Sequence, residues 1–241
     1  MKQAITGNAG PKVRSDIEVK LELTESGGTE LSIKSKVKSM YGKAIEEQCR
    51  FLLDYFGIAN ARLSVNDSGA LPFVIAARVE AAVKALTGTT RSFIPEMIPE
   101  NLYDSSHDRY RFSRLYLPGN SPGMFLNAGL HSPDGVILDL EDSVAPDRKD
   151  EARILVRNAL RTVNFYGAER MIRINQGERG LADLEELIPH NVQLVLIPKC
   201  EDAETVRRVD NKIKDIKAGA GQNEPVFLMP IIESAAGVEH A

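Results

Sequence analysis

Hydrophobic and polar positions alternate near the N-terminus of the chain, over residues 13–23. Ile17 and Val19 occupy alternate positions in this segment, and charged residues stand between them. Because successive side chains on a strand point to opposite faces, this period of two predicts a strand with one buried and one solvated face. A turn at residues 26–28 leads to a second strand at residues 31–37, which we expect to pair with the first.

The hydrophobic period then changes to that of a helix. Apolar residues recur every three or four positions from residue 41 to 56, and again from residue 75 to a glycine at 88. A short strand at residues 61–66 separates the two predicted helices. Residues 1–12, which hold two glycines and a proline, are expected to be irregular. Residues 1–88 therefore predict a small α+β domain.

Residues 89–112 show little periodicity. They contain Pro95, Pro99 and a polar cluster at residues 104–108. Composition of this kind is typical of a connection between domains, so we interpret the segment as a linker.

Beyond the linker, strand-like and helix-like segments alternate. Strands are predicted at residues 114–117, 136–140, 171–174, 192–197 and 226–231, with helices between them at residues 121–130, 148–163, 181–188 and 202–216. Strands that alternate with helices indicate a parallel sheet, so residues 113–241 predict an α/β domain.

The most informative stretch of this second domain is GVILDLEDSVAP at residues 135–146. An apolar run, interrupted by Asp139, leads to Glu141 and Asp142. Such a run predicts a strand buried on both faces, and burying carboxylates at its end is costly unless they are paired, hydrogen-bonded or close to a metal. The alternative is structural, with Asp142 or Ser143 capping the helix that follows.

Polar residues also follow the other predicted strands. They include Pro118-Gly119-Asn120-Ser121, Arg173, Asn175, Lys199 and Glu233. In a (β/α) barrel all strand ends meet at one rim, where the active site lies, and acids with an arginine there can hold a divalent cation and a substrate carboxylate. Taken singly, Glu233 could instead favour a helix N-terminus, and the spacing of Lys199 favours an ordinary surface residue.

Composition limits the classes of function. The 241 residues carry a formal net charge of −4 and no basic stripe, which argues against nucleic acid as a partner. No apolar run approaches the roughly 20 residues needed to span a bilayer, so we expect no membrane partner. Cys49 and Cys200 lack metal-ligand spacing, and a cytoplasmic protein with reduced thiols is the simplest interpretation.

Five motifs of the second domain carry a family resemblance. They are LYLPG at residues 115–119, LDLEDSV at 138–144, IRIN at 172–175, IPK at 197–199 and IIES at 231–234. In order and spacing these motifs resemble the citrate lyase beta subunit, and more broadly the aldolase/citrate lyase barrel family.

The first domain resembles the citrate lyase acyl carrier (gamma) subunit. The resemblance is carried by VNDSGAL at residues 65–71 and AARVEAA at residues 76–82. It implies a phosphoribosyl-dephospho-CoA prosthetic group, attached through a phosphodiester to a serine that stands before an aspartate and a strand. Ser15, followed by Asp16, is the matching serine, although a serine at the start of a strand commonly has only a structural role.

The resemblance of the second domain implies a magnesium-dependent lyase. Glu233 matches the Mg²⁺ ligand, Arg173 the residue that binds the substrate carboxylate, and Glu141 and Asp142 the acids that support the metal-bound water and substrate oxygens. The implied reaction cleaves a citryl thioester to oxaloacetate and an acetyl thioester, with the metal stabilising the developing oxygen charge.

The resemblance also leads us to expect an incomplete fold. A TIM (β/α)8 barrel has eight strands and about 250 residues, whereas five strands are predicted here. We therefore expect a partial barrel without lyase activity of its own, in an oligomeric complex with a citrate lyase alpha-type transferase subunit. Two alternatives remain open: an acyl carrier or assembly module without catalysis, and a lyase for free malyl-CoA or citramalyl-CoA.

Overall fold

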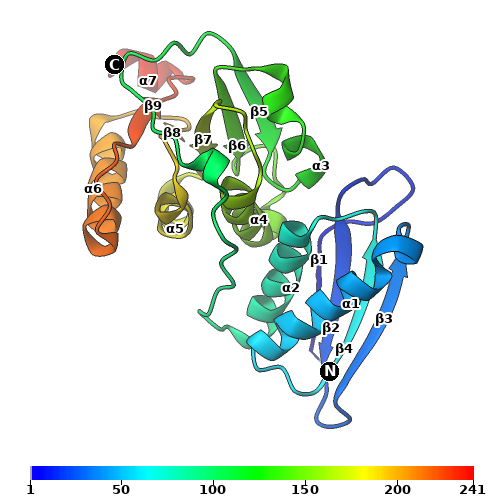
Figure 1. Ribbon diagram of the computed structural model, residues 1–241. Helices are drawn as coiled ribbons and strands as arrows, with labels where there is room; N and C mark the ends of the chain where they lie inside the picture. Colours follow the sequence, from blue (N-terminus) through cyan, green and yellow to red (C-terminus); the bar gives the residue numbers. More distant parts are fainter. Residues whose placement is uncertain (1) are drawn as a thin grey trace. The chain divides into compact units, whose positions relative to one another are not determined.

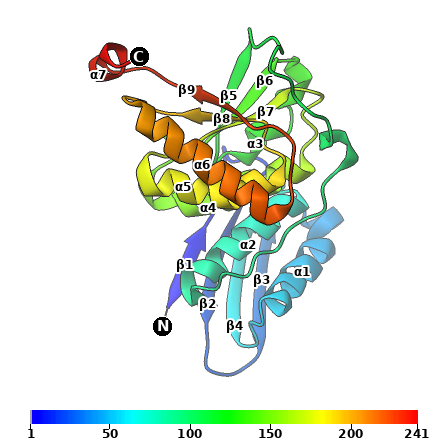
Figure 2. The ribbon, with the colours of Figure 1, turned by 90° about the vertical axis from the view of Figure 1, so that its left-hand side faces the viewer.

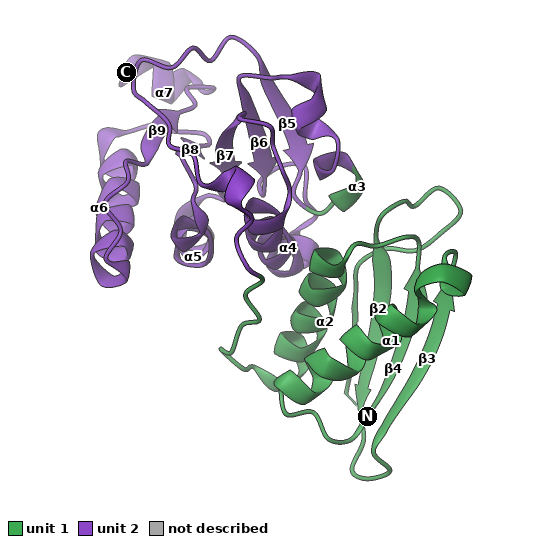
Figure 3. Ribbon diagram, in the orientation of Figure 1, with its two compact units in different colours: residues 1–95, 120–123 green, residues 96–119, 124–241 purple. Residues whose placement is uncertain are grey.

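The computed structural model describes residues 2–241, which form two compact units (Figure 3). The first unit comprises the chain up to Pro95 together with Asn120–Gly123. The second comprises Glu96–Gly119 and Met124–Ala241. None of the helices in residues 2–241 is both long enough and apolar enough to cross a membrane.

In the first unit two helices cover one face of a four-stranded sheet (Figure 1). Its elements are β1 (Gln3–Thr6), β2 (Ile17–Leu23), β3 (Thr29–Ser35), α1 (Lys38–Tyr55), β4 (Ala61–Asp67) and α2 (Pro72–Thr87). Along β2 the side chains of Ile17, Val19 and Leu21 are buried, and those between them are more exposed. The predicted half-buried strand is thus confirmed.

The strand order of this sheet, β1-β2-β4-β3, differs from the expectation in two ways. Strand β1 lies in the segment expected to be irregular and pairs with β2 in antiparallel orientation. The expected pairing of β2 with β3 is wrong, because β4 lies between them and pairs with β3 in parallel orientation. Helix α1 provides the long crossover that a parallel pair requires. The residues of the turn at 26–28 do not indicate that another strand will lie between β2 and β3.

The second unit contains a five-stranded parallel sheet with the order β5-β6-β7-β8-β9. The strands are β5 (Arg114–Pro118), β6 (Gly135–Asp139), β7 (Glu169–Arg173), β8 (Leu194–Ile197) and β9 (Phe227–Pro230). Its α-helices are α4 (Lys149–Thr162), α5 (Gly177–Leu187), α6 (Ala203–Ala220) and α7 (Ala235–Glu239), and α3 (Pro122–Phe125) is divided between the two units. Short 3-10 helices are η1 (Pro99–Asn101), η2 (Ala128–His131), η3 (Pro146–Arg148) and η4 (Ile188–His190).

Helices α4, α5 and α6 follow one another along the same face of this sheet (Figures 1 and 2). This arrangement follows from the strand order, because right-handed crossovers between consecutive neighbouring strands place every helix on one face. On the face away from these helices the side chains of Ile137, Met171, Leu194 and Leu196 form a buried cluster. The helix expected at residues 121–130 is shorter than predicted, since it is divided into α3 and η2.

Much of the segment interpreted as a linker is packed against the second unit. The buried side-chain amide of Asn101 donates to the carbonyl oxygens of Leu160 (3.0 Å) and Val163 (2.8 Å), where α4 ends. The guanidinium of Arg111 forms an ion pair with the buried carboxylate of Glu169 at the start of β7 (2.6 Å). These contacts hold the segment against the end of the sheet where β7 begins.

Candidate active site

A buried ion pair lies at the carboxyl end of the second unit's sheet. In the parallel register of β6 and β7, Asp139 is the partner of Arg173. The Nε and Nη2 atoms of Arg173 each donate to one oxygen of Asp139, both at 2.7 Å, and the Asp139 side chain is only 2% exposed. The same guanidinium lies over the ring of Tyr116 at 5.3 Å. Asp139, which interrupts the apolar run of β6, is therefore paired. This pairing offsets the free-energy cost of burying its charge.

This pairing shifts both pKa values. Burial alone would raise the pKa of Asp139, but the hydrogen bonds from Arg173, Ser143 and the Glu141 backbone outweigh it and lower that pKa. The hydrogen bonds to Asp139 raise the pKa of Arg173 above its usual value. Both groups are therefore charged at neutral pH.

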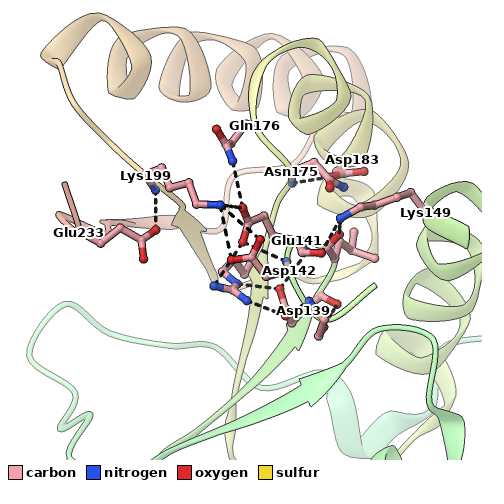
Figure 4. Close-up of polar contacts among 12 residues, drawn as sticks. Asp139, Glu141, Asp142, Lys149, Asn175, Gln176, Asp183, Lys199 and Glu233 are labelled. Carbon is pink, nitrogen blue, oxygen red and sulfur yellow. Dashed lines mark hydrogen bonds and ion pairs between the residues drawn. The ribbon is translucent and has the colours of Figure 1, made fainter. Parts of the chain in front are cut away.

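Glu141 lies two residues beyond Asp139 and joins several side chains of the site (Figure 4). Its Oε1 accepts hydrogen bonds from Lys199 Nζ at 2.8 Å and Gln176 Nε2 at 3.0 Å. Its Oε2 accepts from the backbone N–H of Asp142 at 3.0 Å and lies 3.4 Å from Arg173 Nη1. Because both oxygens have partners and the residue is 4% exposed, Glu141 holds its neighbours in place.

Lys199 connects all three acids that follow the strands (Figure 4). Besides Glu141, its Nζ contacts Asp142 at 3.3 Å, and its backbone N–H donates to Glu233 Oε1 at 2.9 Å. Its φ of 46° is uncommon for a residue other than glycine, a conformation that is enriched at functional sites. The hydrogen bonds to Glu141 and Asp142 raise the pKa of Lys199. Its spacing after β8 favoured a surface residue, and Lys199 is indeed exposed, but it also contacts the acids of the site.

Two further groups, which the sequence did not single out, fix the backbone of this edge. The Nζ of Lys149 donates to the carbonyl oxygens of Leu140 (2.7 Å) and Glu141 (2.5 Å). The carboxylate of Asp183 accepts from the backbone and the side-chain nitrogens of Asn175, both at 2.8 Å. Both lie on amphipathic helices, where a charged residue resembles any other solvated position, so no local signal marks them.

Neither Asp142 nor Glu233 caps a helix. Among residues 2–241 no side chain caps the start of α4, so the capping alternative for Asp142 and Ser143 is wrong. Ser234, and not Glu233, caps α7 by accepting from the backbone N–H of Gly237 at 3.0 Å.

The donor types at this edge fit a hard cation. Glu233 is exposed, and the Asp142 side chain is 64% exposed. Within residues 2–241 no three His, Cys, Asp or Glu side chains lie close enough to form a metal cluster. Mg²⁺ is commonly held by one or two carboxylates together with water and substrate oxygens, so exposed carboxylates such as these are donors of a suitable type.

The fifth predicted site residue, Ser15, belongs to the first unit. It precedes β2, is half-buried, and has a φ of 57°. Its backbone N–H donates to the carbonyl oxygen of Ser68 at 3.0 Å. Its hydroxyl makes no hydrogen bond to another residue of the described chain. The neighbouring Asp16 is buried in a two-point contact with Arg78, at 3.0 Å for each pair of atoms.

The sheet and its edge define a class: α/β proteins whose charged functional side chains follow the ends of consecutive parallel strands. Within this class, residues 113–241 match the HpcH/HpaI aldolase/citrate lyase family. The chain belongs to that family. Residues 2–86 match the malonate decarboxylase delta subunit, an acyl-carrier-type family, so the resemblance of both parts is confirmed.

Two relatives agree with this assignment at the level of sequence. The chain is 35% identical over 136 residues to the citrate lyase subunit beta of Haemophilus influenzae, covering 55% of this chain and 47% of that protein. It is 36% identical over 132 residues to the L-malyl-CoA/beta-methylmalyl-CoA lyase of Cereibacter sphaeroides, covering 53% and 42%. A structure of the Mycobacterium tuberculosis citrate lyase beta subunit, complexed with oxaloacetate and magnesium, is 27% identical with a TM-score of 0.41, covering 54% and 52%. The chain thus spans about half the length of these relatives.

Proposed function

We propose that the protein is the carrier and lyase component of a citrate lyase type system. In this proposal residues 1–88 form the acyl carrier domain, and residues 113–241 contribute to the site that cleaves a citryl thioester to oxaloacetate and an acetyl thioester. The observation that supports it best is the convergence of Arg173, Lys199 and four acids at one edge of a parallel sheet.

We further propose that the five strands belong to a (β/α) barrel. Consecutive strand order with every crossover helix on one face is the arrangement of a barrel, whereas doubly wound sheets place helices on both faces. The five strands make up part of the eight that a complete barrel contains. On this basis residues 113–241 by themselves would lack lyase activity.

Arg173 is proposed to bind the substrate carboxylate. Its Nε and one N–H of Nη2 are directed at Asp139, and Nη1 lies 3.4 Å from Glu141 Oε2, so a substrate carboxylate would bind to the remaining N–H groups of Nη1 and Nη2. Asp139 and the ring of Tyr116 hold the planar group in one orientation. A fixed guanidinium suits two-point recognition of a carboxylate.

Glu233 is proposed as a Mg²⁺ ligand, because its Oε1 is positioned by Lys199 and the carboxylate is exposed. When bound, Mg²⁺ supplies Lewis-acid stabilisation of negative charge on substrate oxygens.

Asp142 is proposed to accept the proton of the substrate hydroxyl. The hydrogen bond with Glu141 and the contact with Lys199 lower the pKa of Asp142, so it is ionised at neutral pH. As the proton leaves, the hydroxyl oxygen forms the ketone carbonyl, and the electrons of the carbon–carbon bond pass into the thioester enolate. The enolate carbon then takes up one proton, which gives the acetyl thioester. Lys199, held by Glu141, keeps positive charge beside this reaction.

Ser15 is proposed as the attachment site of a phosphoribosyl-dephospho-CoA group. A hydroxyl without a partner among the described residues, at the surface of a carrier-type domain, fits a phosphodiester linkage. The partners implied are a citrate lyase alpha-type transferase subunit and other members of the complex, in an oligomer.

One relative favours a second candidate function. The Cereibacter sphaeroides protein is a malyl-CoA lyase, so a lyase acting on free CoA thioesters shares the same family. The carrier-type first domain favours the tethered substrate, because an attached arm makes free CoA unnecessary.

The test uses the protein purified from its host with the subunits that copurify. We expect Mg²⁺-dependent release of oxaloacetate from the carrier-bound citryl thioester, and slower cleavage of free citryl-CoA, malyl-CoA or citramalyl-CoA, each followed through its own 2-oxo acid product. Faster turnover of a free CoA thioester would select the second candidate, and the lack of a 2-oxo acid product from all of these substrates would contradict a lyase.

A further inference from the structure

The first unit contains an apolar cavity of about 310 Å³. It lies where the first turns of α1 and α2 approach each other beside the loop that follows β4. Its apolar lining includes Val37, Tyr41, Ala44, Ile45, Leu71 and Ile75. Tyr41 and Leu71 are 56% and 43% exposed, so apolar surface is left in water at this position. Such exposure costs about 25 cal/mol per Å², which an apolar ligand would recover.

The cavity is built from fixed parts. Asp67, 1% exposed, accepts hydrogen bonds from the backbone N–H groups of Gly69 (3.0 Å) and Ala70 (2.7 Å), which form one wall. Its other oxygen accepts from the hydroxyl of Ser35 at 2.6 Å. The side chain of Gln48 on α1 donates to the carbonyl oxygen of Pro72 at the start of α2 (2.7 Å). These bonds keep the space between the helices open before any ligand arrives.

The loop that carries Ser15 lies against the rim of this cavity. Ser15 is bonded through its backbone to Ser68, the residue before Gly69 of the cavity wall. The Nζ of Lys36, the residue before Val37 of the lining, donates to the carbonyl oxygens of Gly10 (3.2 Å) and Val13 (3.0 Å) in the same loop. Figure 1 shows this loop between β1 and β2 beside the start of α1. Two separate contacts therefore hold the loop that carries Ser15 against residues next to the cavity lining.

Charge and polarity divide this surface into two parts. Three exposed cations, Lys12, Arg14 and Lys36, flank Ser15, and the nearest acid, Asp16, is buried against Arg78. Positive charge at the serine suits a phosphodiester, and the apolar cavity beside it suits an uncharged chain. A phosphodiester-linked arm that ends in a pantetheine thiol or its acyl thioester matches both places. Its phosphodiester suits the cations at the serine, and its uncharged end suits the apolar cavity.

We propose that this cavity receives the thiol or acyl-thioester end of the arm attached to Ser15, and that Lys12, Arg14 and Lys36 face its phosphodiester. The inference rests on the proposed attachment at Ser15. Its consequence is that the carrier shelters the thioester from water between transfers. The arm leaves the cavity when it delivers the acyl group. It is therefore in equilibrium between a position inside the cavity and a position outside it.

The experiment uses the full chain purified from its host with the arm attached. The rate of alkylation of the arm's thiol by iodoacetamide is measured from the mass of the peptide that contains Ser15. An arm that spends nine tenths of its time in the cavity reacts about tenfold more slowly than an exposed thiol. Ala44→Trp fills the cavity from an exposed position on α1 and is expected to raise the rate about tenfold. Ala85→Trp, at an exposed position near the end of α2, is the matched control and should not change it.

Equal alkylation rates in the unsubstituted protein, in A44W and for free coenzyme A would overturn the inference while leaving the attachment at Ser15 intact. Intact-mass analysis that finds no arm on Ser15 would overturn both. Circular dichroism of A44W and A85W shows whether each remains folded.

A second measurement does not depend on the natural arm. A dansyl group on a short alkyl linker is attached to Ser15→Cys, since Cys49 and Cys200 are both buried. Emission at shorter wavelength than from the same label on Ser26→Cys, an exposed turn position, is expected, and A44W should abolish the difference. Identical emission from both labelled positions would contradict the proposed binding of the arm in the cavity.

Discussion

At the scale of single residues, three neighbouring acids have different roles because they differ in how deeply they are buried. Asp139 is buried and bound on both oxygens by Arg173, and Glu141 is buried with four partners. Asp142 is 64% exposed and contacts Lys199 from outside. Residue type alone does not distinguish them, but an exposed carboxylate can bind a ligand, whereas a buried one with both oxygens bonded holds other groups in place.

Replacing Asp139 tests the buried pair. We expect Asp139→Asn to destabilise the second unit by about 3 kcal/mol, since it leaves the guanidinium of Arg173 buried without its two-point partner. The free energy of unfolding in urea measures this. Asp210→Asn removes an acid from the exposed pair with Lys214 and should change stability by less than about 0.5 kcal/mol. Equal effects of the two substitutions would contradict the importance of the buried pair.

His190 makes the stability of the second unit depend on pH. Burial, followed by the charges of Arg161 and Arg157, lowers the pKa of His190 from 6.5 to about 3. Between these values the unfolded chain binds a proton that the folded chain does not, so stability decreases as the pH falls through this window. Between pH 7 and pH 5 this single group accounts for a loss of about 2 kcal/mol.

His190→Gln is therefore expected to make the decrease between pH 7 and pH 5 shallower by about that amount. Urea unfolding at several pH values measures the slope. His131→Gln, at an exposed position, should leave the slope unchanged. A slope that is the same in H190Q as in the unsubstituted chain would show that another group causes the pH dependence.

At the scale of elements, every strand except β1 was predicted, because the order of apolar and polar residues in these segments reflects their burial. The run that forms β6 is buried throughout, and β2 alternates as expected. The packed segment before β5 could not be recognised, because its contacts come from single side chains such as Asn101 and Arg111. Isolated long-range hydrogen bonds leave no periodic pattern.

Two helical glycines provide a matched pair of tests. At Gly180 of α5 a methyl group would collide with the backbone oxygen of Asn175 and lie 3.3 Å from Ile174, so Gly180→Ala is expected to cost about 1–3 kcal/mol. At Gly219 of α6 nothing lies within 4 Å of that position, so Gly219→Ala should stabilise by up to about 1 kcal/mol. The two substitutions are expected to shift the midpoint of urea unfolding in opposite directions. A stabilising G180A would contradict close packing of α5 against the edge of the site.

At the scale of the whole molecule, the two units have different parts in the proposed reaction. Ser15→Ala in the protein isolated with its partners is expected to abolish turnover of carrier-bound substrate and to leave turnover of added free citryl-CoA unchanged. Arg173→Ala should lower both activities by about 10²–10³-fold, because it removes a fixed positive donor from the site. Oxaloacetate release measures each activity. Loss of free-thioester turnover in S15A would contradict the division of labour between the units.

The sequence by itself determined the two kinds of domain, the buried strands and the identity of the residues that follow them, because periodicity and composition record local burial. Tertiary structure alone decided the insertion of β4 between β2 and β3, the pairing of Asp139 with Arg173, and the position of Lys199 among three acids. These features depend on strand register and on crossovers between distant segments. Register decides which side chains meet across a sheet, and it is set by the packing of the whole unit.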